Sequence, residues 1–143
     1  PGEPVRPLNK VASGGELSRI MLAIKSILAS EDEIDTLIFD EIDTGISGKT
    51  ATMVAEKMAN ISRHHQVICI SHLSQIAAMA DNHYLIEKKL ENNSTITNIK
   101  KLSGDESIEE LVRINGDGTV SEAAISHAKE MKEMAERTKS YLI

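Results

Sequence analysis

Apolar positions in the first half of the chain follow helical and strand patterns in turn. Apolar side chains recur at helical spacing and predict a helix over residues 17–30, with a stripe formed by Leu17, Ile20, Met21, Ile24 and Leu28. A continuous apolar run at 36–39 is typical of a strand buried on both faces, and 67–70 is a second buried strand. Helices are expected over 49–61, between these strands, and over 73–80, after them. This order of strand, helix, strand, helix predicts a parallel sheet with crossover helices.

The second half of the chain changes first to an alternating and then to a helical pattern. Residues 84–89 and 95–102 alternate apolar and polar positions around a polar turn, which predicts an antiparallel hairpin. Helices are expected over 105–114 and 121–141, with a glycine-containing turn at 116–118 between them.

The whole pattern predicts one α/β domain over residues 1–143, in which parallel strands with crossover helices are followed by the hairpin and the C-terminal helices. A length of 143 residues suits one compact domain. Residues 1–10 contain three prolines and are expected to be irregular. Because the chain starts with Pro1 and not with Met, we expect a fragment of a longer protein.

Composition and charge exclude several classes of function. The chain has 22 acidic against 16 basic residues and a net charge of −6, so it lacks the overall basic character of a nucleic-acid-binding domain. One Phe, two Tyr and no Trp leave no platform for stacking exposed bases. No apolar run reaches the roughly 20 residues that span a membrane, and residues 1–10 lack the apolar segment of a signal peptide. The single Cys69 cannot form a disulfide within the chain, which fits a reducing cytoplasm.

The first candidate site is the segment 12–19, Ala-Ser-Gly-Gly-Glu-Leu-Ser-Arg, at the start of the first predicted helix. Ser13 and Glu16 match a capping box, in which a hydroxyl and a carboxylate bond to backbone N–H groups. The successive Gly14 and Gly15 suit a close approach of the backbone to another group, and a helix N-terminus favours phosphate. From these residues alone, a plain cap and a phosphate contact both remain open.

The second candidate site is the pair Asp40 and Glu41, at the C-terminal end of the strand predicted over 36–39. Ligands of open α/β sheets bind at this end of the strands. A hydrophobic strand that ends in Asp commonly holds Mg²⁺ in nucleotide hydrolases, and a following Glu can orient or deprotonate an attacking water. Because side chains alternate along a strand, we expect the two carboxylates to point differently and to have different roles. The alternative is a pair of solvated charges.

The third candidate is His72, which follows the second predicted strand. If the two strands are neighbours, His72 emerges at the same sheet edge as Asp40 and Glu41, and this favours a place in the site over a purely structural role. Three other histidines are expected in loop-like or exposed positions and are assigned no function: His64, His65 and His83.

Residues 43–50 match a P-loop only in part. Gly48, Lys49 and Thr50 precede a predicted helix, but the pattern G-x-x-x-x-G-K-[ST] requires Gly where Asp43 stands. The neighbouring carboxylates would also repel the phosphates that such a loop holds. We therefore predict no phosphate-binding loop here or elsewhere in the chain.

Three motifs together resemble the C-terminal lobe of an ABC-type, P-loop ATPase head. Ser-Gly-Gly-Glu at 13–16 resembles its signature motif, Leu-Ile-Phe-Asp-Glu at 37–41 its Walker B strand, and Ile-Ser-His at 70–72 its switch histidine. The longer strings at 12–19 and 39–48 are most similar to the RecN DNA-repair proteins, relatives of the SMC family. The resemblance covers nearly the whole chain.

The resemblance implies that two heads enclose ATP and Mg²⁺. Asp40 would hold Mg²⁺ through water, Glu41 would polarise the attacking water, and His72 would sense the γ-phosphate. The phosphate of ATP bound to the opposite subunit would be contacted by the start of the first helix: Ser13, Gly14, Gly15 and Glu16. The D-loop between the two ATP sites would be formed around Asp43, Thr44, Gly45 and Ser47, and Asp43 would also support the geometry at the strand end.

The chain departs from the usual motifs at Ala12, where the signature commonly has Leu, and at Ser47, where the D-loop commonly has Asp; both departures agree with the RecN branch. A working head of this family also needs a P-loop and a glutamine loop from an N-terminal lobe, which this sequence lacks. The parent protein is therefore expected to be an ATPase, while this chain is expected neither to bind ATP tightly nor to hydrolyse it alone. The resemblance implies three partners: that N-terminal lobe, a second head in a homodimer, and DNA through the full-length protein. It implies no contact with a membrane, and a location in the cytoplasm in association with the nucleoid.

The expected function is that of a C-terminal ATPase-head lobe in recombinational repair of DNA double-strand breaks, where ATP binding joins two heads and hydrolysis releases them. Two alternatives stay open. One is a self-sufficient nucleotide-binding enzyme that uses residues 48–50 as a degenerate P-loop. The other is a non-catalytic interaction module, whose acidic helices at 105–114 and 121–141 dock a partner.

Overall fold

The chain divides into two compact units, Pro1–His72 and Leu73–Ile143, and each is described by itself. The computed structural model describes residues 6–29, 31, 33–91, 94–116 and 120–142. Parts of the predicted irregular start and of two predicted turns fall on residues outside this part of the chain: 1–5, 92–93 and 117–118. The described end of that start, residues 8–10, forms a short 3-10 helix. The single domain over 1–143 stays a prediction.

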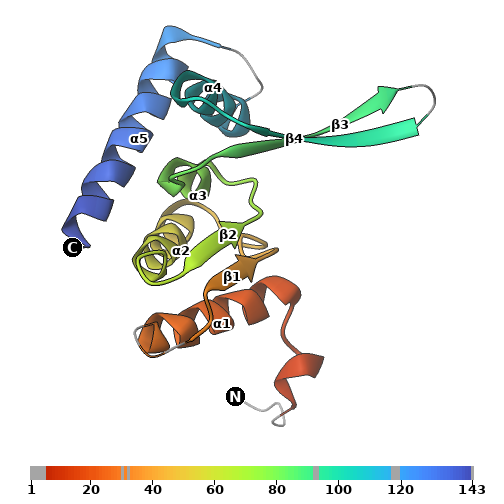
Figure 1. The fold of residues 1–143 in the computed structure, drawn as a ribbon, viewed down its shortest axis with the longest axis vertical. Helices are drawn as coiled ribbons and strands as arrows, with labels where there is room; N and C mark the ends of the chain where they lie inside the picture. Colours follow the sequence, from red (N-terminus) through yellow and green to blue (C-terminus); the bar gives the residue numbers. More distant parts are fainter. Residues whose placement is uncertain (1–5, 30, 32, 92–93, 117–119, 143) are drawn as a thin grey trace. The chain divides into compact units, whose positions relative to one another are not determined.

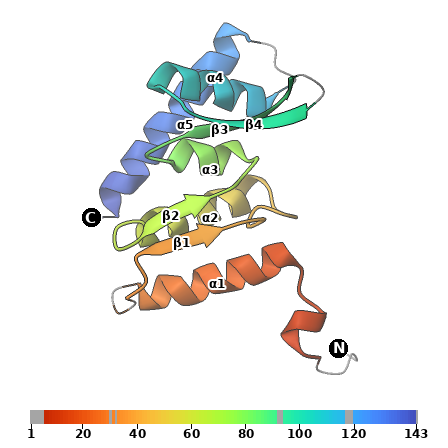
Figure 2. The ribbon, with the colours of Figure 1, turned by 45° about the vertical axis from the view of Figure 1, so that its right-hand side comes forward.

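The first unit contains a parallel pair of strands and the helices beside it (Figures 1 and 2). Its elements are a short 3-10 helix η1 (Leu8–Lys10), then α1 (Gly14–Leu28), β1 (Thr36–Phe39), α2 (Gly48–Ile61) and β2 (Gln66–Cys69). β1 and β2 pair in parallel, with Thr36 beside Gln66 and Phe39 beside Cys69, and α2 is the crossover between them. The predicted parallel arrangement with a crossover helix is confirmed.

Helix α1 begins earlier than the apolar pattern predicted, at Gly14 and not at residue 17. Apolar periodicity starts only at Leu17, so it does not report a first turn made of glycines and a carboxylate. The capping box of Ser13 and Glu16 marks the true start, and both of its reciprocal hydrogen bonds are present.

The prediction that β1 and β2 are both buried strands is wrong. Leu37 and Phe39 are buried, whereas Ile38 between them is 68% exposed. The described residues of this unit cover one face of the strand pair and leave the other face open. Ile68, the register partner of Ile38, and the following Ile70 are also exposed, so apolar side chains gather on the uncovered face.

The second unit combines a hairpin with three helices (Figure 1). Its elements are α3 (Ser74–Met79), β3 (Tyr84–Glu91), β4 (Ser94–Lys101), α4 (Gly104–Asn115) and α5 (Glu122–Tyr141). β3 and β4 are antiparallel, which confirms the predicted hairpin. The three helices share a core of buried residues: Ala78, Leu111, Val112 and Ala128. No helix in the described part of the chain has the length and apolar character needed to cross a membrane.

Candidate functional site

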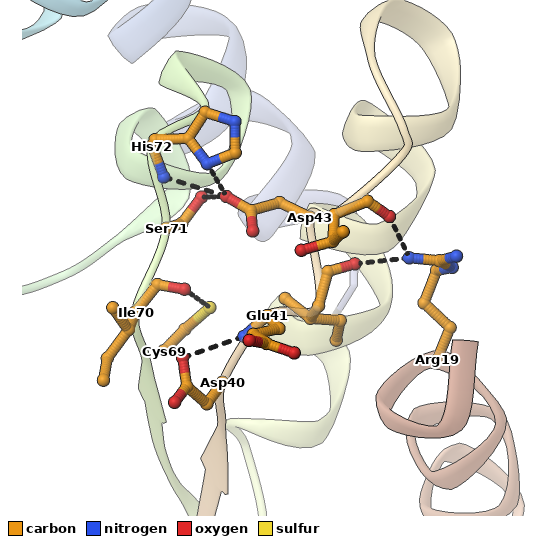
Figure 3. A network of polar contacts seen from close by, with 10 residues as sticks. Arg19, Asp40, Glu41, Asp43, Cys69, Ile70, Ser71 and His72 are labelled. Atoms are coloured by element: carbon orange, nitrogen blue, oxygen red, sulfur yellow. Dashed lines mark hydrogen bonds and ion pairs between the residues drawn. The ribbon is translucent and has the colours of Figure 1, made fainter. Parts of the chain in front are cut away.

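The ends of β1 and β2 bring two polar segments, 40–43 and 71–72, to one edge of the parallel pair (Figure 3). The N–H of Ile70 donates to the carbonyl of Phe39 at 3.0 Å, so the strands stay together up to the point where both chains turn away. This places His72 at the same edge as Asp40, as the sequence predicted.

Asp43 is the centre of the polar contacts at this edge. It is only 4% exposed, yet three donors reach its Oδ2 oxygen. The Ser71 hydroxyl donates at 2.7 Å and the His72 backbone N–H at 2.8 Å, and His72 Nδ1 lies 2.9 Å away. Asp43 thus ties the residues after β2 to the loop after β1.

The surroundings of Asp43 favour its charged form. Burial raises the pKa of Asp43, but hydrogen bonds from Ser71 and His72 and the positive potential of His72 outweigh burial, so the pKa lies below its ordinary value. The contact with a carboxylate also assigns the proton on the His72 ring to Nδ1. The His72 side chain is 75% exposed, so its other edge is accessible to a ligand.

Asp40 and Glu41 are both exposed at the end of β1. Asp40 Oδ1 accepts a hydrogen bond from the Glu41 backbone N–H at 2.9 Å. Glu41 has φ of 56°, a left-handed conformation that is uncommon for a residue with a side chain. The N–H of Thr44 donates to the Glu41 carbonyl at 3.0 Å and closes a turn over residues 41–44. Backbone strain of this kind is typical of functional sites.

The start of α1 lies directly against this turn. An ideal Cβ at Gly15 would lie 2.6 Å from the Glu41 carbonyl oxygen, and one at Gly14 would lie 2.5 Å from Glu41 Oε2. The two glycines therefore allow a close approach, and the group they approach in this structure is Glu41 of the same chain. The capping box is closed by Ser13 N–H to Glu16 Oε2 at 2.7 Å and Glu16 N–H to Ser13 Oγ at 3.3 Å. Hydrogen bonds from the backbone N–H and the hydroxyl of Ser13 to Glu16 Oε2 lower the pKa of the Glu16 carboxyl.

Sequence reasoning included Ser18 and Arg19 in the candidate segment 12–19 but assigned neither residue a role. The Ser18 hydroxyl donates to the carbonyl of Asp40 at 2.9 Å. Arg19 Nη1 donates to the carbonyls of Ile42 and Thr44, both at 2.9 Å (Figure 3). Two adjacent polar residues inside a largely apolar helix are the one signal that could have drawn attention to them.

The remaining D-loop candidates lie in an exposed stretch between the turn and α2. Thr44, Gly45 and Ser47 are exposed, and Gly45 has φ of 74°, which its lack of a side chain permits. Lys49 and Thr50 lie exposed in the first turn of α2.

The burial of His65 was not predicted from the sequence. His65 lies in the bend before β2, as expected, but it is not exposed: it is buried at 5% exposure with its Nδ1 at 2.5 Å from the carbonyl of Ile34. The chain turns there to start β2, and the His65 ring contacts the backbone before β1.

Cys69 is partly buried beside the site. Burial, together with the negative charges of Asp43 and Asp40, raises the pKa of its thiol to about 12. This thiol is not a nucleophile at neutral pH.

The carboxylates of Asp40 and Glu41 suit a metal ion that takes most of its ligands from water and phosphate oxygens. Among the described residues, no group of three or more His, Cys, Asp or Glu side chains could hold a metal. Mg²⁺ commonly keeps several waters and takes one or two carboxylates together with phosphate oxygens. The exposed carboxylates of Asp40 and Glu41 at the strand end fit that mode of binding.

Comparison with known proteins gives a consistent result. The chain is 48% identical to the DNA repair protein RecN of Bacillus subtilis over 139 residues, which is 97% of this chain and 24% of that protein. It is 47% identical to the DNA repair protein RecN of Treponema pallidum over 130 residues, 91% of this chain and 23% of that protein. The chain thus spans about a quarter of the length of these curated relatives. No protein-family model matches it.

A solved structure supports the same fold. It comes from a study of ATP-driven dimerization and DNA-stimulated activation of SMC ATPases, and it matches with a TM-score of 0.53 and 19% identity. The match covers 80% of this chain and 68% of that one. The fold is therefore that of an SMC-type ATPase head lobe, as predicted. The chain belongs to the RecN family and corresponds to the C-terminal part of a RecN protein.

Proposed function

We propose that this chain is the catalytic C-terminal lobe of a RecN-type ATPase head that acts in recombinational repair of DNA double-strand breaks. The observation that carries the proposal is the shared strand edge, where Asp40 and Glu41 follow β1 and His72, held by Asp43, follows β2. Side chains of these types at the carboxyl ends of parallel strands suit the binding and hydrolysis of Mg-ATP.

Each residue at the edge has a distinct role in this proposal. Asp40 would hold Mg²⁺ through water, and the bound ion would neutralise charge on the phosphates. Glu41 would accept a hydrogen bond from the attacking water and orient it. The exposed ring edge of His72 would face the γ-phosphate, while Asp43 keeps the ring in place through Nδ1.

The start of α1 would contact ATP bound to a second head. The cap uses the N–H groups of Ser13 and Glu16, so the N–H groups of Gly14 and Gly15 would face the phosphate. Residues 43–47 would form the D-loop between the two ATP sites of such a homodimer.

The rest of the protein would supply what this chain lacks. Its relatives are about four times longer, since the chain covers 24% of the Bacillus subtilis protein. We propose that an N-terminal lobe brings the P-loop and covers exposed apolar side chains of the first unit, such as Ile20, Met21 and Ile38. DNA would be engaged through the full-length protein. Phosphoryl transfer depends on the positioning of the reacting groups. Because the site would be divided among lobes and subunits, ATP hydrolysis would occur only when these parts are assembled.

Isothermal titration of Mg-ATP tests this proposal. ATP is titrated into the chain alone and into the chain mixed with a separately expressed N-terminal lobe of the same protein, and turnover is then measured. We expect no binding by the chain alone, and ATP binding and hydrolysis by the mixture. Glu41→Gln should lower turnover about 100-fold or more, because it removes a carboxylate that orients the water. Glu33→Gln, at an exposed position before β1, is the matched control and should leave turnover unchanged.

Two outcomes would contradict the proposal. Micromolar binding of ATP by the chain alone, lost in Lys49→Ala, would favour the self-sufficient enzyme with a degenerate P-loop. Unchanged turnover of Glu41→Gln in the full-length protein would favour the non-catalytic interaction module.

A further inference from the structure

We propose that Arg19 is a positioning residue, which fixes the turn over residues 41–44 to the start of α1 so that the Glu41 carboxylate and the α1 N-terminus keep one geometry. The inference rests on the proposed role of Glu41 in ATP hydrolysis. It adds a residue outside the motifs of the strand edge and a link between two parts of the site.

The contacts of Arg19 are directed at the backbone of the turn. Its Nη1 nitrogen donates to the carbonyls of Ile42 and Thr44, each at 2.9 Å (Figure 3). One nitrogen with two hydrogens thus holds two carbonyls, one on each side of Asp43. The side chain of Ile42 is fully buried, so the turn is held from the core below and by the guanidinium from α1.

Two further residues of α1 adjoin the same backbone. The Ser18 hydroxyl donates to the Asp40 carbonyl at 2.9 Å, immediately before Glu41. A Cβ on Gly15 would lie 2.6 Å from the Glu41 carbonyl oxygen and 3.2 Å from Arg19 Nη1. Gly15 therefore leaves the space in which the guanidinium and the turn meet.

The conformation of Glu41 shows why such support is needed. Its φ of 56° is unfavourable for a residue with a Cβ. A backbone conformation of this kind persists only where contacts with the surrounding structure stabilise it. The hydrogen bond from Thr44 N–H to the Glu41 carbonyl, at 3.0 Å, depends on the same turn. Without Arg19, we expect Glu41 to relax toward common backbone angles and its carboxylate to leave its place beside Gly14.

The link has a consequence for the proposed dimer. The N-terminus of α1 would contact ATP on a second head, whereas Glu41 would serve the site of its own head. Arg19 joins the two through hydrogen bonds within one chain, so the phosphate contact at one ATP site and the water-orienting carboxylate at the other would keep a fixed relative geometry.

The test uses the full-length protein with three substitutions: Arg19→Ala, Arg19→Lys and the control Arg63→Ala, which removes a guanidinium from an exposed position after α2. We expect Arg19→Ala to lower kcat for ATP about 10- to 100-fold, as a displaced catalytic group does, with little change in KM. Arg19→Lys should restore part of kcat, since an ammonium can donate to one of the carbonyls but does not match the planar guanidinium. Arg63→Ala should match the unmodified protein.

Amide hydrogen exchange provides a readout that does not depend on activity. Arg19→Ala and Arg19→Lys should speed exchange at Thr44 N–H, which closes the turn, while Ile70 N–H, which joins β2 to β1, keeps its protection. If Arg19→Ala fails to fold, the same comparison is made with Arg19→Lys.

The possible results separate the two proposals. Unchanged exchange at Thr44 in both variants would overturn the positioning by Arg19. Faster exchange with unchanged kcat, while Glu41→Gln is inactive, would overturn its catalytic relevance and leave the proposed function intact. Full activity of Glu41→Gln would overturn the proposed function and this inference with it.

Discussion

At the scale of single residues, Asp43 determines how the two strand ends are joined. A carboxylate that is 4% exposed is stable only if donors surround it, and Ser71 and His72 supply them. The same contacts hold the His72 ring, so the stability of the edge and the orientation of a proposed catalytic side chain depend on one carboxylate.

Substitution of Asp43 tests this dependence. We expect Asp43→Ala to lower the free energy of unfolding of the chain by about 1–3 kcal/mol, because the Ser71 hydroxyl and the His72 N–H lose their acceptor. Asp43→Asn keeps an acceptor oxygen and should cost less. Urea unfolding measures both variants, and Asp35→Asn, at an exposed position before β1, is the control. Equal stability of Asp43→Ala and the unmodified chain would contradict the assigned hydrogen bonds.

The lowered pKa of Asp43 also predicts a dependence of stability on pH. A carboxyl with a lower pKa in the folded state stabilises the fold above its unfolded pKa, near 3.8, and loses this contribution as the pH falls through the folded value. The difference in free energy of unfolding between the unmodified chain and Asp43→Asn should therefore shrink below about pH 4. Urea unfolding between pH 7 and pH 3 measures it. A difference that grows in acid would contradict the direction of the shift.

At the scale of elements, the two glycines that open α1 are expected to differ. A Cβ at Gly15 would meet the backbone oxygen of Glu41, whereas a Cβ at Gly14 would meet the movable end of the Glu41 side chain. Gly15→Ala should therefore destabilise the chain by about 1–3 kcal/mol through overpacking, while Gly14→Ala should stay within about 0.5 kcal/mol. Thermal unfolding of the two variants measures this difference in stability. Equal effects would contradict the prediction, because they would show that the turn moves to make room for a Cβ at Gly15.

The order of elements could be predicted from the sequence, but the contacts of α1 with the turn could not. Apolar periodicity reports the helix from Leu17 onward, and the apolar run at β1 reports a strand, because both depend on local spacing. The hydrogen bonds of Arg19 join residues more than 20 positions apart, and the left-handed backbone of Glu41 lies in the turn that they contact. Nor does an apolar run reveal that one face of β1 stays uncovered, since that depends on what packs against it.

At the scale of the whole molecule, large apolar side chains of the first unit lie exposed on α1 and on the strand pair. Along α1, the side chains of Ile20, Met21 and Ile24 are 37–49% exposed, and on the open face of the strands Ile38 is 68% exposed. Large exposed apolar patches mark sites of association. The proposed occupant is the N-terminal lobe, because the chain covers 24% of the Bacillus subtilis relative and lacks a P-loop.

Ile38 and Ile99 form a matched pair for testing that association. Both lie in strands and both are 68% exposed, but Ile38 is on the open face of the first unit and Ile99 on the hairpin of the second. Ile38→Asp should weaken binding of a separately expressed N-terminal lobe at least about tenfold, because the isoleucine that the lobe would bury is replaced by a charge that binding must desolvate. Ile99→Asp should bind as the unmodified chain does, which titration calorimetry can measure. Equal affinities of the two variants would mean that the lobe covers another surface, and that the open face of β1 and β2 has a different partner.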